Sequence, residues 1–140
     1  ISDLKINNLN FVKHSSNQKI KNNTDIYLVD TYGETSKFYD LTNITFLGGS
    51  IIKHGGQNPL EPARKGNYIL SGPNIDNFRE VYAFLRQIKL STISSDPLKL
   101  EKLIRSKINK KISNQLQKKI INIGDNILIN NLKEIKGLIK

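Results

Sequence analysis

The sequence contains no cysteine, no methionine and no tryptophan among its 140 residues. Without cysteine, the chain has neither disulfides nor thiolate metal sites. No apolar run approaches the roughly 18 residues that span a bilayer, and the first ten residues lack the pattern of a signal peptide. We therefore expect a soluble chain, or at most one bound to a membrane surface. Because methionine is absent, we also expect a processed or truncated product.

Acidic residues are scarce in one part of the chain. Residues 1–96 carry 11 Lys and Arg against 9 Asp and Glu, whereas residues 97–140 carry 11 against 3. A basic tail of this kind could bind nucleic acid, anionic phospholipid or a phosphorylated glycolipid. However, Ile, Lys and Asn make up 56 of the 140 residues, and all three have AT-rich codons. The lysine excess is therefore weak evidence for any one partner.

A strand, a glycine loop and a helix N-terminus are predicted in succession between residues 44 and 62, which read ITFLGGSIIKHGGQNPLEP. Two glycine pairs follow the apolar run Ile44–Leu47. Asn58 is a good N-cap, Pro59 suits the first helical position, and Glu61 falls in the first turn. Such a junction directs backbone N–H groups one way, and glycines let an anion approach them. We predict a phosphate site here, with an ordinary strand-to-helix turn as the alternative.

Strands and helices alternate along the rest of the sequence. A length of 140 residues suits one domain with one core. Alternating units of this kind predict an α/β fold, in which helices cover both faces of a right-handed parallel sheet. We expect strands at residues 10–13, 26–29, 44–47, 68–70 and 88–92. We expect helices at residues 34–41 and 58–65. A further helix should start at Phe78, capped by Asn77, and another at Pro97, capped by Ser95 or Asp96. Residues 108–140 should form one or two amphipathic helices, with a break at Gly124.

The segment FLGGSIIKHGGQNPLEPARKGNYILSGPNIDNF closely resembles the C-terminal half of the 3-deoxy-D-manno-octulosonic acid (Kdo) transferases. That family shows a GGS, an HGGxNPLEP-like run and a GPxxxNF element in this order. Residues 31–39, TYGETSKFY, also resemble its T-x-GE-x3-FY segment. The resemblance is strong over residues 26–85. It implies a Rossmann-like, three-layer α/β/α domain, the C-terminal half of a two-domain GT-B glycosyltransferase whose N-terminal acceptor domain is not in this sequence.

The resemblance also implies a function in lipopolysaccharide biosynthesis. Kdo transferases move Kdo from CMP-Kdo to a lipid A precursor at the cytoplasmic face of the bacterial inner membrane. We expect this domain to bind CMP and to meet the lipid A precursor only through the missing domain. We expect no metal, no other cofactor and no nucleic acid partner, while contact of the basic tail with the membrane surface stays open.

The residues that we expect to contact CMP are Tyr32, Gly33, Glu34, Gly49, Ser50, Gly56, Asn58, Pro59, Leu60 and Glu61. In this interpretation the phosphate lies over the start of the helix at Asn58, with further backbone N–H donors near Gly49, Ser50 and Gly56. Glu61 would accept from the ribose hydroxyls, or would only complement the helix dipole. Tyr32 and Gly33 would border the base or the sugar.

Histidine is rare in this chain, with two residues. His54 could meet the carboxylate of the donor sugar as a cation, or be structural or solvated. His14 and Lys13 could face a ligand, although an exposed histidine in a polar loop is more often solvated. We find no candidate for the general base that deprotonates the acceptor, and the family places it in the absent domain. We therefore expect the chain alone to be inactive.

Three other interpretations stay open. One is the donor domain of another GT-B enzyme that uses a UDP-sugar. A second is a basic nucleic-acid-binding module, although no recognition helix or aromatic-studded sheet is evident. The third is a structural domain that has lost its activity.

Overall fold

The computed structural model describes residues 1–122, which form two compact units that divide between Thr35 and Ser36. The expected single domain stays a prediction, as do the structures expected at residues 123–140, including the helix break at Gly124, because they lie outside the described residues.

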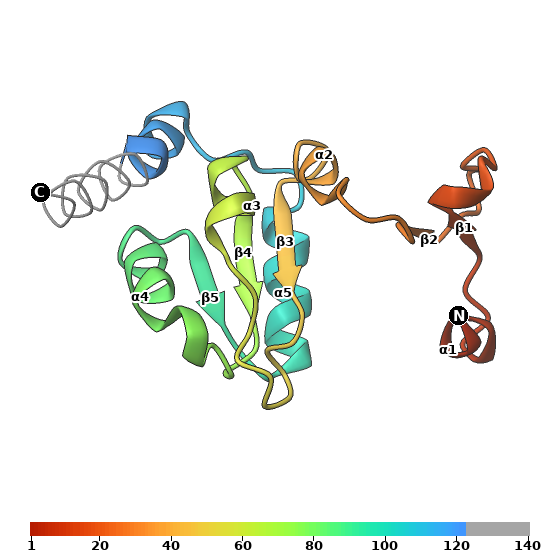
Figure 1. Ribbon diagram of the computed structural model, residues 1–140, viewed down its shortest axis with the longest axis horizontal. Helices are drawn as coiled ribbons and strands as arrows, with labels where there is room; N and C mark the ends of the chain where they lie inside the picture. The colour runs from red at the N-terminus through yellow and green to blue at the C-terminus, as the bar shows by residue number, and fades with distance from the viewer. Residues whose placement is uncertain (123–140) are drawn as a thin grey trace, which may run out of the picture. The chain divides into compact units, whose positions relative to one another are not determined.

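The first unit is built on a pair of parallel strands (Figure 1). Phe11 pairs with Ile26, and Lys13 pairs with Leu28. Both strands lie where the sequence predicts them. The short helical segments before and after the first strand were not predicted, because neither carries a cap or a hydrophobic period. The elements of this unit are α1 (Ser2–Ile6), β1 (Phe11–Lys13), η1 (His14–Ser16) and β2 (Ile26–Leu28).

The second unit contains a three-stranded parallel sheet in the order β3-β4-β5. The central strand, β4 (Tyr68–Ser71), is buried at all four positions, as expected for a strand covered on both faces. It pairs with β3 (Ile44–Leu47) on one side and with β5 (Ser91–Ile93) on the other. The predicted strands at 44–47 and 68–70 are confirmed.

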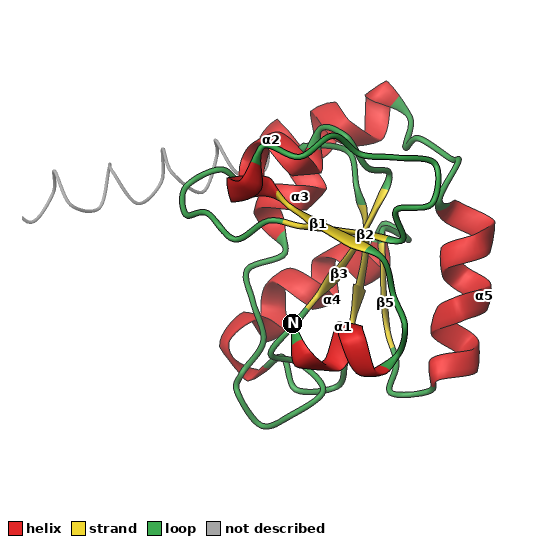
Figure 2. Ribbon diagram, turned by 90° about the vertical axis from the view of Figure 1, so that its right-hand side faces the viewer, coloured by secondary structure: helices red, strands yellow, loops and turns green. Residues whose placement is uncertain are grey.

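Helices cover both faces of this sheet. Figure 2 shows α3 (Leu60–Arg64) and α4 (Arg79–Gln87) on one side of the strands and α5 (Pro97–Lys107) on the other. Two right-handed crossovers that advance in the same direction put their helices on the same face, which explains why α3 and α4 share a side. The predicted Rossmann-like, three-layer α/β fold is confirmed. Two further helical segments are α2 (Thr35–Tyr39) and η2 (Asp76–Phe78).

The core lies between the sheet and its helices. Ile69 and Leu70 of β4 are fully buried, and so are Tyr82 and Leu85 of α4. Ile120, from the helical residues 114–122, also belongs to this core. Among residues 1–122, no helix is both long enough and apolar enough to cross a bilayer.

The predicted strand at 88–92 begins three residues later in the structure. Ile88 ends α4, and its N–H donates to the Phe84 carbonyl at 3.2 Å. Lys89 then adopts a left-handed conformation with φ +58°, and β5 follows from Ser91. A short apolar run fits the end of a helix as well as a strand. The start of the predicted strand, at Ile88, therefore belongs to the end of α4.

Predictions about helix ends had mixed outcomes. Asp96 caps α5 as predicted, because its Oδ1 accepts from the Leu98 N–H at 2.9 Å. Asn77 does not cap α4, because it lies inside the 3₁₀ turn η2 and contacts Gly55 instead. The predicted start of the last helix, at Ile108, was also wrong. Residues 110–113 are not helical, and the helix begins at residue 114.

Candidate functional site

The carboxyl end of β3 opens into the loop of residues 48–59. Leu47 is buried, and the chain then turns through Gly49, Gly55 and Gly56 with φ of +66°, +83° and +76°. Residues with a Cβ rarely adopt these values, so each position favours glycine. This loop, residues 48–59, is called the glycine loop below. It leads into α3 at the edge of the sheet where ligands bind in open α/β folds.

The start of α3 is close to the predicted arrangement. The Oδ1 atom of Asn58 accepts from the Leu60 N–H at 3.0 Å, as a capping asparagine does. Pro59 has helical dihedral angles (φ −85°, ψ −8°), although the hydrogen-bonded helix begins one residue later, at Leu60. Glu61 lies in the first turn and is exposed. Pro59, Pro62 and Ala63 are buried, so Glu61 is the exposed residue of this first turn, directly after the glycine loop.

Two of the predicted site residues use polar groups to hold the loop itself. Ser50 is fully buried, and its hydroxyl donates to the Leu47 carbonyl at 2.6 Å and accepts from the Gly72 N–H at 2.8 Å. The Gly56 N–H donates to the Gly49 carbonyl at 3.1 Å. The loop is therefore shaped before any ligand arrives, which is what a preorganised anion site needs.

A second loop, residues 72–77, forms hydrogen bonds with the glycine loop. Asn74 donates through its backbone N–H to the Ser50 carbonyl at 2.9 Å. Its side-chain Nδ2 donates to the carbonyls of Ser50 and Ile51 at 3.1 and 3.0 Å. A Cβ on Gly72 would lie 2.4 Å from the Ser50 carbonyl oxygen, so no larger residue fits there. The positioning role of Asn74 was missed in the sequence, where its only signal is its place within the GPxxxN element.

The second loop also contacts the far end of the glycine loop. The Asn77 N–H donates to the Gly55 carbonyl at 3.3 Å, and the Asn77 side chain packs where a Gly55 Cβ would be. His54 packs against Gly49, with Cδ2 at 3.2 Å from the position of a Cβ there. The structural role considered for His54 thus has support in these contacts.

The charge of Glu61 acts on Tyr39 of the preceding helix, α2. Burial raises the pKa of the Tyr39 hydroxyl, and the negative charge of Glu61 raises it further. The exposed carboxylate of Glu61 offers only acceptors, so it is suited to accept from sugar hydroxyls.

The predicted residues of the first unit follow β2. Tyr32 is fully exposed, and Gly33 has φ +80°. The Oε2 atom of Glu34 accepts from the Thr31 hydroxyl at 2.7 Å and lies 3.0 Å from Nε2 of His14. The structure thus pairs His14, which we expected to be solvated or to face a ligand, with Glu34. Whether residues 32–34 share one site with residues 49–61 stays a prediction, because each group is placed only within its own unit.

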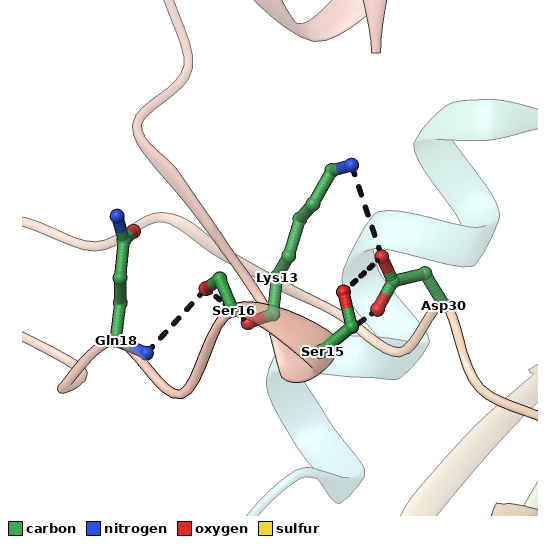
Figure 3. A network of polar contacts seen from close by, with 5 residues as sticks. All are labelled: Lys13, Ser15, Ser16, Gln18 and Asp30. Atoms are coloured by element: carbon green, nitrogen blue, oxygen red, sulfur yellow. Dashed lines mark hydrogen bonds and ion pairs between the residues drawn. The ribbon is translucent and has the colours of Figure 1, made fainter.

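The turn after β1 is tied to the end of β2 by a separate network (Figure 3). Ser15 donates to Asp30 through its backbone N–H at 3.0 Å and through its hydroxyl at 2.8 Å. These two donors lower the pKa of the Asp30 carboxyl, with a smaller contribution from the charge of Lys13. The network holds the turn that carries His14.

Comparison with known proteins gives the same result in sequence and in structure. A transferase named for 3-deoxy-D-manno-octulosonic acid, from Haemophilus influenzae, is 31% identical over 137 residues, which is 97% of this chain. The Rickettsia prowazekii protein of the same name is 36% identical over 81 residues, 58% of the chain. The crystal structure of the C-terminal CMP-Kdo binding domain of WaaA from Acinetobacter baumannii matches 75% of this chain and 55% of its own, with a TM-score of 0.70 and 27% identity.

The chain is related to the C-terminal domain of the Kdo transferases. It spans only 31% of the Haemophilus influenzae Kdo transferase and 17% of the Rickettsia prowazekii one. No family model matches the sequence.

No group of three or more histidine, aspartate or glutamate side chains within residues 1–122 is arranged to hold a metal ion. Donor binding without a metal, as expected from the Kdo transferase resemblance, stays a prediction.

Proposed function

We propose that the chain is the donor-binding domain of a Kdo transferase and holds CMP-Kdo during transfer of the sugar. The observation that carries this proposal is the agreement in fold, at 27% identity, with a domain described as binding CMP-Kdo. The GGS, HGGxNPLEP-like and GPxxxNF motifs lie on the loops after β3 and β4, at the carboxyl end of the three-stranded sheet, where such a ligand would bind.

We place the CMP phosphate against the glycine loop and the first turn of α3. Gly49 and Ser50 bring backbone close to the ligand, and Gly56 closes the loop around it, because its own N–H donates to the Gly49 carbonyl. Asn58, Pro59 and Leu60 form the turn below the ligand. Because α3 has only five residues, the loop amides rather than the helix dipole supply most of the attraction. One well-aimed donor in a dry site contributes about 3 kcal/mol to stabilising a developing charge. A few such donors could support the leaving CMP without a metal ion.

The remaining contacts are assigned to the nucleoside. Glu61 accepts from the ribose hydroxyls, since a carboxylate binds a vicinal diol through two acceptors. Tyr32 and Gly33 border the base or sugar, and Glu34 lines the same pocket. This part of the proposal requires residues 32–34 and 49–61 to meet around one ligand.

The function of the whole protein is a wider proposal, because the chain spans less than a third of its Haemophilus influenzae relative. We infer a GT-B enzyme of lipopolysaccharide biosynthesis that transfers Kdo to a lipid A precursor at the cytoplasmic face of the inner membrane. The general base and the acceptor site would lie outside these 140 residues. Contact of basic residues 97–140 with the membrane surface would assist docking.

Titration calorimetry of the chain with CMP, UMP and UDP tests the donor assignment. We expect CMP to bind at least tenfold more tightly than UMP and UDP, a difference of about 1.4 kcal/mol. Glu61→Gln should weaken CMP binding, while Glu101→Gln, on the exposed face of α5, should not. Tighter binding of UDP would favour a UDP-sugar enzyme. Binding of DNA with a steep salt dependence, and no binding of CMP, would favour a nucleic-acid-binding module.

A further inference from the structure

The imidazole of His14 is held from both sides within the first unit. Its Nδ1 lies 2.6 Å from the Tyr27 hydroxyl, and its Nε2 lies 3.0 Å from Oε2 of Glu34. The Tyr27 ring also packs edge-on against the imidazole, with ring centroids 5.7 Å apart. A neutral imidazole satisfies both polar contacts in one arrangement, in which Nε2–H donates to Glu34 and the Tyr27 hydroxyl donates to Nδ1.

This arrangement fixes one oxygen of the Glu34 carboxylate. Oε2 accepts from the Thr31 hydroxyl and from His14, and the two donors approach from different segments of the chain. The side chains of His14 and Glu34 are 31% and 28% exposed, so the pair is partly accessible. The carboxylate is therefore oriented by its neighbours and still reached from solvent.

We propose that His14 is a positioning residue, which orients Glu34 so that its carboxylate accepts a hydrogen bond from an N–H or O–H group of the bound nucleotide. This inference rests on the proposed donor-binding function. The ligand group is either the 4-amino group of cytosine or a ribose hydroxyl, because an ionised carboxylate offers only acceptors. Uracil carries a carbonyl in place of that amino group, so only the first source distinguishes CMP from UMP.

Four variants of the 140-residue chain test the proposal by titration with CMP and UMP. Glu34→Gln should weaken CMP binding about tenfold, the effect of one hydrogen bond to a charged group. His14→Leu should weaken it by a similar factor, whereas His14→Gln, whose side-chain amide can still donate to Glu34, should stay within about twofold of the unmodified chain. The double variant His14→Leu/Glu34→Gln should bind no more weakly than Glu34→Gln alone, because coupled residues are not additive.

A control separates positioning from simple support of the turn. Ser15→Ala alters the same 3₁₀ turn and breaks contacts to Asp30, but Ser15 has no hydrogen bond to Glu34 among the described contacts. It should leave CMP affinity unchanged even where it lowers the melting temperature. If Ser15→Ala weakens CMP binding as much as His14→Leu does, the turn as a whole matters and the proposal is overturned.

The outcomes also separate this inference from the proposed function. If the unmodified chain fails to bind CMP, the donor-binding function fails, and the inference fails with it. If the chain binds CMP but His14→Leu binds equally well, or its effect adds in full to that of Glu34→Gln, only the role of His14 is refuted. Loss of CMP affinity with unchanged UMP affinity assigns the contact to the cytosine amine, and equal loss for both assigns it to the ribose.

Discussion

Two buried polar side chains of the second unit differ in how their hydrogen bonds are satisfied. Asn67 is fully buried, and its Oδ1 accepts from the Thr45 hydroxyl at 2.7 Å while its Nδ2 donates to the Tyr39 carbonyl at 2.8 Å. Tyr82 is also fully buried, but its hydroxyl has no hydrogen-bond partner among the described residues. Burial raises the pKa of Tyr82 above the ordinary value of a tyrosine.

Tyr82→Phe should therefore leave the free energy of unfolding at pH 7 unchanged or raise it by up to about 1 kcal/mol, because an unsatisfied buried hydroxyl is removed. Since the pKa is higher in the folded state, the unfolded chain loses the Tyr82 proton first, and stability falls as pH rises above about 10. The variant should lose this part of the alkaline destabilisation. Denaturant unfolding at pH 7 and at about pH 11 measures both effects.

Tyr68→Phe is the matched control for that experiment. The Tyr68 hydroxyl lies 2.6 Å from the Thr92 hydroxyl, so its removal should lower the free energy of unfolding at pH 7 by about 1 kcal/mol. Equal losses in the two variants would show that Tyr82 has a hydrogen-bond partner after all.

At the scale of elements, the loop of residues 48–59 depends on the loop of residues 72–77. The link runs through Asn74, which binds two carbonyls of the glycine loop, and through Gly72, which lets the two backbones touch. Both loops follow parallel strands, so both lie at the carboxyl edge of the sheet. Preorganisation of this kind lowers the entropy cost of binding an anion.

Asn74→Ala should lower the free energy of unfolding by about 1–2 kcal/mol, because two carbonyls lose a donor. It should also weaken CMP binding severalfold, since the loop must then be ordered by the ligand. Thermal melts and CMP titrations of the variant measure the two effects. Asn114→Ala, at an exposed asparagine, serves as control. Unchanged CMP affinity in a destabilised Asn74→Ala chain would mean that the glycine loop keeps its shape unaided.

At the scale of the whole molecule, the chain contains the candidate donor-binding loops, and in our proposal the general base lies outside it. The chain spans 31% of the Haemophilus influenzae relative, and in our proposal the acceptor domain lies outside these 140 residues. Donor binding and sugar transfer should therefore be separable.

We predict that the 140-residue chain binds CMP and yet transfers no Kdo when incubated with CMP-Kdo and a lipid A precursor. Mass spectrometry of the lipid detects any product, and a full-length Kdo transferase provides the positive control. Formation of a Kdo-modified lipid by the chain alone would place the general base within these residues.

The sequence by itself determined the fold class and the order of most elements. Glycine pairs, a proline after a capping asparagine, and short apolar runs are local signals, and they predicted the strand–loop–helix unit from Ile44 to α3. The capping role of Asp96 was equally local. Strand β5 begins later than predicted because it follows the end of α4, where apolar residues fit a helix and a strand equally well.

Only the tertiary structure decided which polar groups meet. His14 and Glu34 are 20 residues apart, and Ser50 and Asn74 are 24 residues apart, so no local pattern joins them. It also assigned the Ser50 hydroxyl to the fold rather than to a ligand. Parallel strands bring the ends of distant segments to one edge of a sheet, and the side chains that come together there depend on register and packing, which local sequence does not specify.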